Sequence, residues 1–358
     1  MPDLRHAARH PRATLREARR RLLAPSPEPT PTAPPEPAVP PAPSATEVLQ
    51  AVGAQLDTAG RVALTISCRD ADILPKVEGA GQVFESPHGP VQRMHNGVDV
   101  PHLGYFGDWM AEIIEALDGH HEPQEELAFA RILERIDRPD PVIVELGCFW
   151  AYYSTWFLRS FPDGTAVACE PDPEHLEVGR QTARINGVDI RFEQAAGGAS
   201  DDDVLDLPSW NHPGTVHRVP VRTVPTLVEE HGLDRIDVLH LDIQGSELAV
   251  LESCRGLVEQ ERIRFVVVST HHHTISGDPL THQRCLDLVR SLGGHVIAEH
   301  TVLESFSGDG LLVASFDDVD RGFEVELSRA RTTEALFPSG EQELERLRAA
   351  YEELRARG

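Results

Sequence analysis

Beyond Pro141, short apolar runs alternate regularly with amphipathic segments, and this alternation limits the possible folds more than any other feature of the chain. Stretches such as 142–144 and 265–268 are continuously apolar, as is typical of strands that are covered on both faces. Repeated strand-helix-strand units favour parallel pairing through right-handed crossovers. We therefore predict an α/β fold with a doubly wound, mainly parallel sheet. The expected strands are 142–146, 165–170, 189–195, 219–222, 237–243, 264–270, 294–300 and 310–316, and the expected helices between them are 152–160, 173–186, 224–231, 246–260 and 279–292.

The rest of the chain divides by composition. Residues 1–24 carry seven arginines against two acids and are expected to be a disordered basic tail, and the ten prolines of residues 25–44 predict an extended linker. We assign residues 45–140 to N-terminal additions, with helices at 44–56, 107–119 and 120–136 and a strand at 61–67. A C-terminal extension, residues 317–358, follows the predicted core domain of residues 141–316. It ends in a charged helix whose apolar residues allow either self-association or packing against its own domain; they are Leu344, Leu347, Tyr351 and Leu354.

The charge and the cysteines exclude several classes of function. The 358-residue chain has a net charge of −25, which repels nucleic-acid phosphates, so we expect no nucleic-acid partner. No apolar run approaches the 18 residues of a membrane span. The five cysteines are scattered and form no CxxC pair, which argues against a disulfide framework or a zinc-thiolate site and favours a cytoplasmic location. No complete set of metal ligands is evident.

Acidic residues end the first two predicted strands of the core. Glu145 and Gly147 stand at the first strand end, but the two further glycines of a dinucleotide-binding turn are missing, and Phe149 and Trp150 occupy the place of a pyrophosphate. Glu170 ends the second strand, where an acid in mononucleotide-type folds accepts hydrogen bonds from the ribose hydroxyls. Together these ends predict a nucleoside cofactor without phosphates. S-adenosylmethionine fits, because its sulfonium favours carboxylates and aromatic faces.

The remaining strand ends offer candidates for the adenine and the reacting groups. At the third end, Gln194 and the backbone of Ala195 are candidates for contact with adenine. Asp242 ends the fourth strand and is expected beside the transferring methyl group. The fifth end carries His271, His272 and His273, of which the first and third are expected to share one side of the strand. One imidazole is a candidate general base, and all three are candidates for contact with the acceptor.

These motifs, in their order, resemble the FkbM family of S-adenosylmethionine-dependent methyltransferases. The stretches that carry the resemblance are VIVELGCFWAYYS, CEPDP, RFEQAAGG, VPVRTVPTLVEEHGLDRIDVLHLDIQGSELAVLE and SGDGLLVAS, within residues 119–316. The resemblance implies the seven-stranded Rossmann-like sheet of class I methyltransferases. It also implies methylation of a hydroxyl group on a sugar, a polysaccharide or a polyketide-type natural product, so that the partner is a small-molecule or glycan acceptor.

The resemblance assigns roles position by position. Glu145 and Gly147 match the acidic-x-Gly cofactor turn, Glu170 matches the ribose-binding acid, and Asp242, Gly245 and Glu247 match the Asp-x-x-Gly-x-Glu signature. Glu122 and Pro123 resemble a Glu-Pro pair that precedes the first strand, which implies that His121, Glu122 and Gln124 lie near the methionine end of the cofactor. The sequence departs from the family pattern at three positions, which are Phe149 (usually Asn), Ala151 (usually Gly) and Gln244 (usually an acid). Ala151 still permits close approach of the cofactor.

Methyl transfer requires the acceptor oxygen to be aligned with the sulfonium and water to be excluded. Asp242 and His271 are both candidates for the base that removes the hydroxyl proton. Two other functions stay open: a cofactor-binding scaffold that has lost catalysis, and a nicotinamide-dependent oxidoreductase. The missing phosphate-binding glycines argue against the latter.

Overall fold

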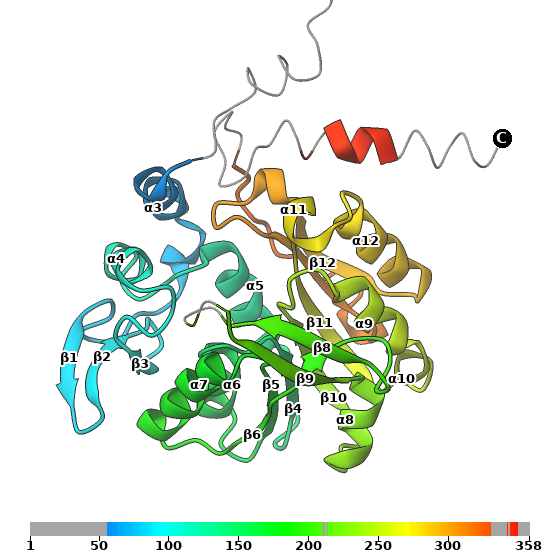
Figure 1. The fold of residues 1–358 in the computed structure, drawn as a ribbon, viewed down its shortest axis with the longest axis horizontal. Coiled ribbons are helices and arrows are strands. Elements are labelled where there is room, and N and C mark those ends of the chain that lie inside the picture. The colour runs from blue at the N-terminus through cyan, green and yellow to red at the C-terminus, as the bar shows by residue number, and fades with distance from the viewer. Residues whose placement is uncertain (1–55, 210–211, 213, 331–341, 343, 350–358) are drawn as a thin grey trace, which may run out of the picture. The chain divides into compact units, whose positions relative to one another are not determined.

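A seven-stranded sheet lies at the centre of the computed structural model (Figure 1), which describes residues 56–209, 212, 214–330, 342 and 344–349. The strand order is β12-β13-β11-β10-β4-β5-β6, and every pair is parallel except those that β13 makes with β11 and β12. The predicted doubly wound, mainly parallel sheet is therefore confirmed. The strands are β4 (Val142–Leu146), β5 (Thr165–Cys169), β6 (Ile190–Glu193), β10 (Ile236–Leu241), β11 (Ile263–Thr270), β12 (His295–His300) and β13 (Gly310–Ser315).

Both faces of this sheet are covered by apolar side chains, as the continuous apolar strands predicted. Within β4 the side chains alternate, so that Ile143 packs into one hydrophobic cluster while Val142 and Val144 pack into another. The first cluster draws residues from α5, α6 and α7, and the second draws residues from α8, α9, α10 and α12. These helices are α5 (Pro123–Leu133), α6 (Tyr152–Ser160), α7 (Pro173–Asn186), α8 (Val224–Glu230), α9 (Glu247–Ser253), α10 (Arg255–Glu259) and α12 (Thr281–Ser291).

The strand predicted at 219–222 does not belong to the central sheet. It forms the end of β9 (Val216–Arg222), which pairs antiparallel with β8 (Val204–Pro208) and parallel with the short β7 (Ala196–Gly197). The three strands make a separate sheet between β6 and α8 in the chain. The sequence pattern could not show whether this strand belongs to the central sheet or to the separate one, because alternating apolar residues indicate a strand but not the strand with which it pairs.

The strand predicted at 61–67 is wrong, because these residues lie within the helix α3 (Thr58–Ser67). The side chain of Asp57 caps this helix by accepting a hydrogen bond from the Gly60 amide at 2.8 Å. Val62 and Thr65, which are three residues apart, form its buried face. The β-branched residues suggested a strand, but the cap and tertiary packing outweigh that weak propensity.

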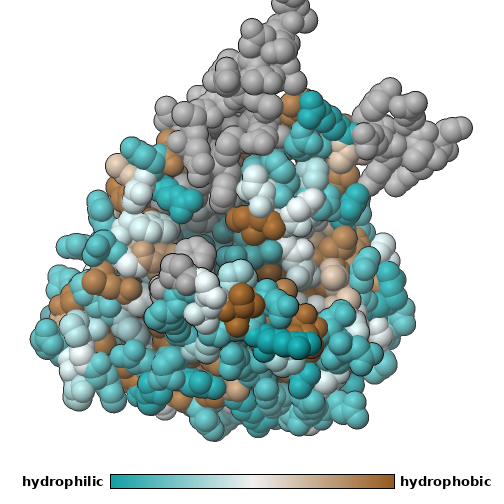
Figure 2. Space-filling view, in the orientation of Figure 1, coloured by the Kyte–Doolittle hydropathy of each residue, from teal (hydrophilic) through white to brown (hydrophobic). Residues whose placement is uncertain are grey.

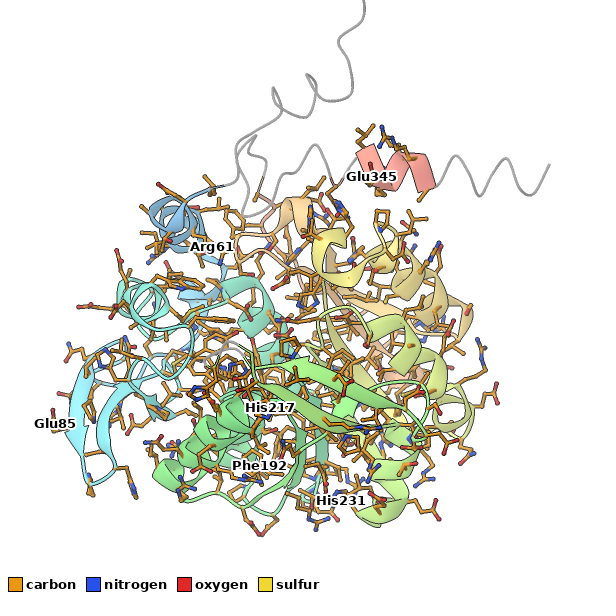
Figure 3. All side chains as sticks on the ribbon, in the orientation of Figure 1. Arg61, Glu85, Phe192, His217, His231 and Glu345 are labelled. Atoms are coloured by element: carbon orange, nitrogen blue, oxygen red, sulfur yellow. The ribbon has the colours of Figure 1, made fainter. Side chains whose placement is uncertain are left out.

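The region between α3 and α5 holds elements that the sequence pattern only partly indicated. Helix α4 (Asp108–Ala116) agrees with the predicted helix at 107–119. Arg61 of α3, which is labelled in Figure 3, lies over the ring of Trp109 in α4, 5.4 Å from its centroid. A small antiparallel sheet precedes α4 where no regular structure was predicted. Its strands are β1 (Val83–Ser86), β2 (Gly89–Arg93) and β3 (Asp99–Pro101).

The part of the C-terminal extension up to residue 330 is fixed to the sheet by buried and half-buried ion pairs. Arg264 of β11 makes two hydrogen bonds to the Asp320 carboxylate, at 3.0 and 3.1 Å. Arg329 contacts Glu299 of β12, which also accepts a hydrogen bond from His282 at 2.9 Å. The predicted tail and linker, residues 1–44, lie outside the described residues.

We expect Glu299 to stabilise the fold above pH 4.5 and to lose this contribution in acid. The hydrogen bond from His282, together with Arg329, outweighs burial and lowers the pKa of Glu299 to about 2 from an ordinary value of 4.5. Since the folded pKa is the lower one, the stabilisation disappears as the pH falls from about 4.5 towards 2. Glu299→Gln should cost about 1–2 kcal/mol at pH 7, less than the full shift implies because the carboxylate is partly exposed.

Urea unfolding of the wild type and the variant from pH 7 down to pH 3 measures this difference. The two stabilities should converge as the pH falls, whereas Glu259→Gln, at an exposed residue of α10, should match the wild type throughout. A difference for Glu299→Gln that is constant with pH would contradict the assignment.

The face of the molecule in Figure 2 is mostly hydrophilic, with hydrophobic side chains scattered among the polar ones, in keeping with a net charge of −25. Among the helices that the structure describes, none combines the length and apolar character needed to cross a bilayer.

Candidate functional site

The carboxyl ends of β4, β5 and β10 meet at one edge of the sheet, beside the point where strand order reverses. From β4 the chain moves outward through β5 to β6, and it then crosses back to β10 on the other side of β4. Ligands of doubly wound sheets bind in the crevice that this reversal opens. Three loops enter it, which are residues 147–151, 170–172 and 242–246.

The backbone of the first loop is close to the chain of β10 and requires glycine at 147. Gly147 has φ +80°, and a Cβ atom there would lie 1.8 Å from the carbonyl oxygen of Asp242. The amides of Gly147 and Cys148 both donate to the carbonyl of Cys169, at 2.8 and 3.0 Å. The next amide, that of Phe149, donates to the Glu170 carboxylate. These N–H groups are already bonded within the protein, so they are not free to form a cradle for a pyrophosphate.

Glu170 is held as a carboxylate acceptor at the end of β5. Its Oε2 accepts from the Phe149 amide at 3.1 Å, and its Oε1 accepts from the Asp172 amide at 2.9 Å. The following helix, α7, is capped by Asp172, which accepts hydrogen bonds from the Glu174 and His175 amides, so Glu170 is not the cap. Each carboxylate oxygen of Glu170 keeps a further acceptor site for a ligand hydroxyl.

A pocket of about 360 Å³ opens over these loops, a size suited to a small ligand. Its lining combines carboxylates, histidines and aromatic rings, and it includes no arginine or lysine among the described residues. The lining residues are Tyr105, Phe106, His121, Glu122, Glu145, Gly147, Cys148, Phe149, Trp150, Tyr153, Glu170, Pro171, Asp172, His175, Ala196, Gly197, Leu205, Leu207, Pro208, His240, Asp242, Ile243, Gln244 and Ser246. A pocket so rich in carboxylates favours a cationic ligand.

The two aromatic residues of the first loop, Phe149 and Trp150, line the pocket and stack on rings from other segments. Trp150 is 4% exposed and stacks on Tyr105, with ring centroids 4.3 Å apart. Phe149 stacks on His175 of α7 at 3.7 Å. Ala151, by contrast, is buried in the left-handed conformation at φ +54° and does not line the pocket.

Two of the predicted cofactor-binding residues, Glu145 and Glu122, line the pocket with side chains that are mostly buried. Glu145 accepts a hydrogen bond from the Ser154 amide at 2.9 Å, and burial raises its pKa. Glu122 precedes α5, and burial together with the charge of Glu125 holds its pKa well above the usual range. The predicted neighbour Gln124 does not line the pocket, because its amide instead bonds to the Ser328 carbonyl of the C-terminal extension at 2.7 Å.

The third strand end is displaced by two residues from the prediction. The side chain of Gln194 is exposed, and Ala195 is buried without lining the pocket. Ala196 and Gly197, which form β7, line it instead. The predicted strand ran to residue 195, whereas β6 ends at Glu193 and the chain then turns into the second sheet.

Asp242 lines the pocket, and its carboxylate contacts the imidazole of His271. Its Oδ1 atom lies 3.1 Å from Nε2 of His271, whose Nδ1 lies 2.8 Å from Oε1 of Glu247. Burial works against protonation of this imidazole, but the carboxylates around it outweigh burial and hold its pKa well above the usual value. His271 is therefore an imidazolium between acids, and it does not line the pocket. This arrangement argues against His271 as the general base.

His272 and His273 do not line the pocket. The expectation that His271 and His273 share one side of the strand is wrong, because neither residue belongs to it. Strand β11 ends at Thr270, and the short helix α11 (His273–Ser276) begins before the alternation can continue. Nδ1 of His272 bonds to Thr274 at 2.9 Å, and Nδ1 of His273 lies 2.6 Å from Oε1 of Gln342. The predicted acceptor contact of all three histidines lacks support in this geometry.

Two polar groups in the pocket lack a partner within the described structure and were not predicted from the sequence. Nδ1 of His240 and the hydroxyl of Tyr153 are buried without a hydrogen bond, and the two rings lie 4.4 Å apart. Burial opposes a charge on His240, but its hydrogen bond to Glu125 at 2.7 Å outweighs burial and raises its pKa. His240 of β10 precedes Asp242, the first residue after that strand, by two positions, and this spacing was a usable signal for a shared face.

Comparisons with known proteins found one matching family model, one related sequence and several similar solved structures. Residues 129–296 match the model of the methyltransferase FkbM domain. The 2-O-methyltransferase NoeI of Sinorhizobium fredii is 24% identical over 204 residues, which is 49% of this chain and 83% of that protein. The solved structures that are similar include a methyltransferase FkbM from Methylobacillus flagellatus, with 14% identity, a TM-score of 0.36 and coverage of 57% of this chain and 54% of that one. They also include a precorrin-6y C5,15-methyltransferase from Geobacter metallireducens, with 14% identity, a TM-score of 0.34 and coverage of 53% and 87%.

Proposed function

Because this chain belongs to the FkbM methyltransferases and has the class I methyltransferase sheet, we propose that it transfers the methyl group of S-adenosylmethionine to a hydroxyl group. The acceptor that we propose is a sugar, a polysaccharide or a polyketide-type natural product. When bound, S-adenosylmethionine supplies the methyl group. The printed name of the NoeI relative, a 2-O-methyltransferase, supports oxygen as the methylated atom.

Glu170 supports this assignment most directly. Its carboxylate is oriented by two backbone amides at the end of β5 and opens onto the pocket, which suits the two ribose hydroxyls of an adenosine. The neighbouring amides of Gly147 and Cys148 are bonded to Cys169, which disfavours a cofactor that carries a pyrophosphate. S-adenosylmethionine has the ribose and lacks the phosphates, and its sulfonium suits the carboxylates of the lining. The same observations disfavour a nicotinamide cofactor.

The residues on the other side of the pocket suit a hydroxylic acceptor. The Asp242 carboxylate is 31% exposed, and it can accept the proton that the hydroxyl loses. His271 is a positioning residue, because it orients Asp242 through the 3.1 Å contact. The unpartnered groups of His240 and Tyr153 are able to hold polar atoms of the ligands.

Methyl transfer from isotopically labelled S-adenosylmethionine to a panel of oligosaccharides and natural-product extracts tests this proposal. We expect label in a product that gains one methyl group, and an O-methyl signal in its NMR spectrum. Labelling at nitrogen or carbon would contradict the hydroxyl assignment. Binding of S-adenosylmethionine without turnover on any extract would favour a non-catalytic scaffold instead.

A further inference from the structure

Two residues of the pocket lining, His240 of β10 and Tyr153 of α6, hold buried polar atoms without partners. The two residues are only 2% and 4% exposed. Nδ1 of His240 and the hydroxyl of Tyr153 have no hydrogen-bond partner within the described residues, and the two rings lie 4.4 Å apart. A buried polar group without a partner is costly, and a ligand that supplies the partner removes this cost.

Both groups are able to donate a hydrogen bond to a ligand. Nε2 of His240 lies 2.7 Å from Oε1 of Glu125, and Oε2 of Glu125 accepts from the Ser269 hydroxyl at 2.7 Å. Because this carboxylate accepts on both sides, Nε2 carries a proton. Burial opposes a second proton at Nδ1, whereas Glu125 and the other acids of the lining favour it, and a bound anion would favour it further. The phenol of Tyr153 keeps its proton near pH 7.

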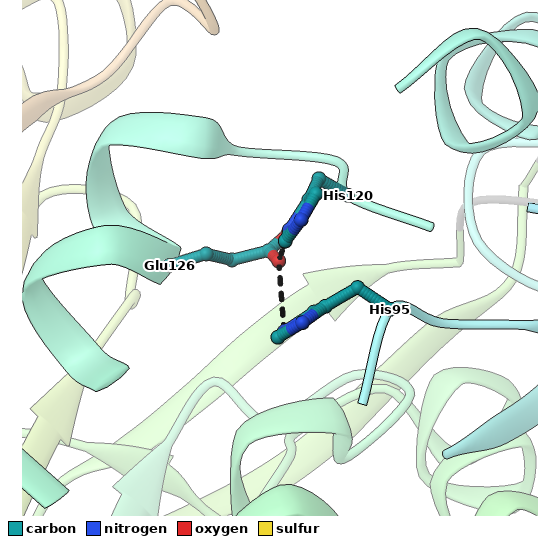
Figure 4. A group of neighbouring side chains, drawn as sticks. All are labelled: His95, His120 and Glu126. Carbon is teal, nitrogen blue, oxygen red and sulfur yellow. Dashed lines mark hydrogen bonds and ion pairs between the residues drawn. The ribbon is translucent and has the colours of Figure 1, made fainter. Parts of the chain in front are cut away.

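A second histidine of the lining, His121, is already held by acids. Its Nδ1 lies 2.6 Å from Oε1 of Glu126, and its Nε2 lies 3.5 Å from Oε2 of Glu122. Glu126 is fully buried, and its Oε2 lies 2.5 Å from Nδ1 of His120, beside the ring of His95 (Figure 4). Both ring nitrogens of His121 therefore face carboxylates, which makes this residue a poor site for a further anion.

The third histidine of the lining, His175, lies at the end of the pocket where we place the ribose. Its Nδ1 is 3.8 Å from Oε1 of Glu170. The lining includes no arginine or lysine among the described residues, and the backbone amides of residues 147–149 are all bonded within the protein. An anionic ligand group that lies away from the ribose end therefore finds its donors at His240 and Tyr153.

The register of the central sheet places His240 beside an acid. His240 pairs with Glu145 on the neighbouring parallel strand β4, so both side chains point to the same face of the sheet, and adjacent strands lie about 4.8 Å apart. A donor and an acid at this spacing suit an amino acid group, whose carboxylate and ammonium are attached to one carbon atom. Glu170 ends β5, on the other side of β4, so a cofactor with its ribose there would extend its remaining part towards His240.

We propose that Nδ1 of His240 and the hydroxyl of Tyr153 hold the carboxylate of the methionine end of S-adenosylmethionine, while Glu145 accepts from its ammonium group. This inference rests on the proposed function and assigns the two donors a part in cofactor binding only. Glu125 is a positioning residue, because it fixes the His240 ring through Nε2. The acids of the lining then face the cations of the cofactor, and the two donors face its anion.

Decarboxylated S-adenosylmethionine tests this site in a calorimetric titration of the full-length protein. The analogue lacks only the carboxylate and is more positive by one charge, so the acidic lining alone would bind it more tightly than the cofactor. The proposed site predicts the opposite order. The wild type should bind S-adenosylmethionine about 10–100-fold more tightly, the value of hydrogen bonds to a charged group. Equal or tighter binding of the analogue would overturn the proposal.

Two variants identify the donors. Tyr153→Phe removes only the hydroxyl, and His240→Gln keeps an amide donor near the position of Nε2, facing Glu125, but loses Nδ1. Each should weaken binding of S-adenosylmethionine by about tenfold or more and change the affinity for the analogue by less than about threefold. Tyr152→Phe is the matched control, because Tyr152 does not line the pocket and its hydroxyl lies 3.2 Å from Nδ2 of Asn96. It should keep the wild-type ratio of the two affinities.

The outcomes separate this site from the proposed function. Variants that bind S-adenosylmethionine and keep the wild-type ratio of the two affinities would overturn the site and leave the proposed function intact. A wild type that binds neither compound would overturn both. If His240→Gln does not fold, Tyr153→Phe and the comparison of the two compounds in the wild type decide.

Discussion

Replacing Asp242 by asparagine should lower kcat for methyl transfer by about 10²–10⁴-fold, the usual contribution of a general base. Asparagine keeps the size of the side chain and an oxygen that faces His271, but it cannot accept the proton of the acceptor hydroxyl. Since Asp242 lines the pocket while His271 does not, the effect should fall on the chemical step. Steady-state kinetics with the labelled cofactor, together with the binding affinity for S-adenosylmethionine, separates an effect on the chemical step from an effect on cofactor binding.

We expect the dissociation constant for S-adenosylmethionine to change less than about tenfold in Asp242→Asn. Glu252→Gln, at an exposed residue of the neighbouring helix α9, provides the matched control and should keep full activity. A variant that retains wild-type kcat would exclude Asp242 as the base. A large loss of cofactor affinity with unchanged kcat would instead place Asp242 only at the sulfonium.

The strand-end acids could be predicted because the signals that place them are local. A strand that is apolar on both faces can be recognised from about five consecutive residues, and parallel strands bring their carboxyl ends to the same edge of the sheet. Glu145, Glu170 and Asp242 were found in this way, and all three line the pocket. Their roles in binding and catalysis stay predictions until they are tested.

The parts of the site that were missed depend on contacts between distant segments. Tyr105 faces the pocket because its loop folds back to stack on Trp150, 45 positions later in the chain, and nothing local indicates this. The histidines at 271–273 were misplaced because the alternation rule holds only while a strand continues, and β11 ends at Thr270. The tail helix is described only at residues 342 and 344–349, where Leu347 is 52% exposed. Its proposed self-association is untested, and Tyr351 and Leu354 lie outside the described residues.

Gly147→Ala should destabilise the protein by roughly 2–5 kcal/mol, through both backbone strain and overpacking. The left-handed conformation at φ +80° disfavours any side chain, and the new Cβ would lie 1.8 Å from the carbonyl oxygen of Asp242. The loop or the end of β10 must therefore move, which would displace Asp242 as well. The free energy of unfolding in urea measures the loss.

Gly187→Ala is the matched control for this substitution. Gly187 also has positive φ, +65°, but a Cβ atom there would meet no atom of the described residues within 4 Å. It should cost only the conformational strain, about 1–2 kcal/mol. If Gly147→Ala were no more destabilising than Gly187→Ala, the close approach of the β4 loop to β10 would be wrong.

Calorimetric titration with S-adenosylmethionine tests the central claim most directly, that the carboxylate-lined pocket binds a nucleoside cofactor without phosphates. We expect one site per chain in the wild type and no binding of NAD. Glu170→Gln should weaken binding about 10–100-fold, the cost of losing hydrogen bonds to a charged acceptor. Glu177→Gln, at an exposed residue of α7, should bind as the wild type does. A wild type that binds no S-adenosylmethionine, or a Glu170→Gln variant that binds it with unchanged affinity, would contradict the account.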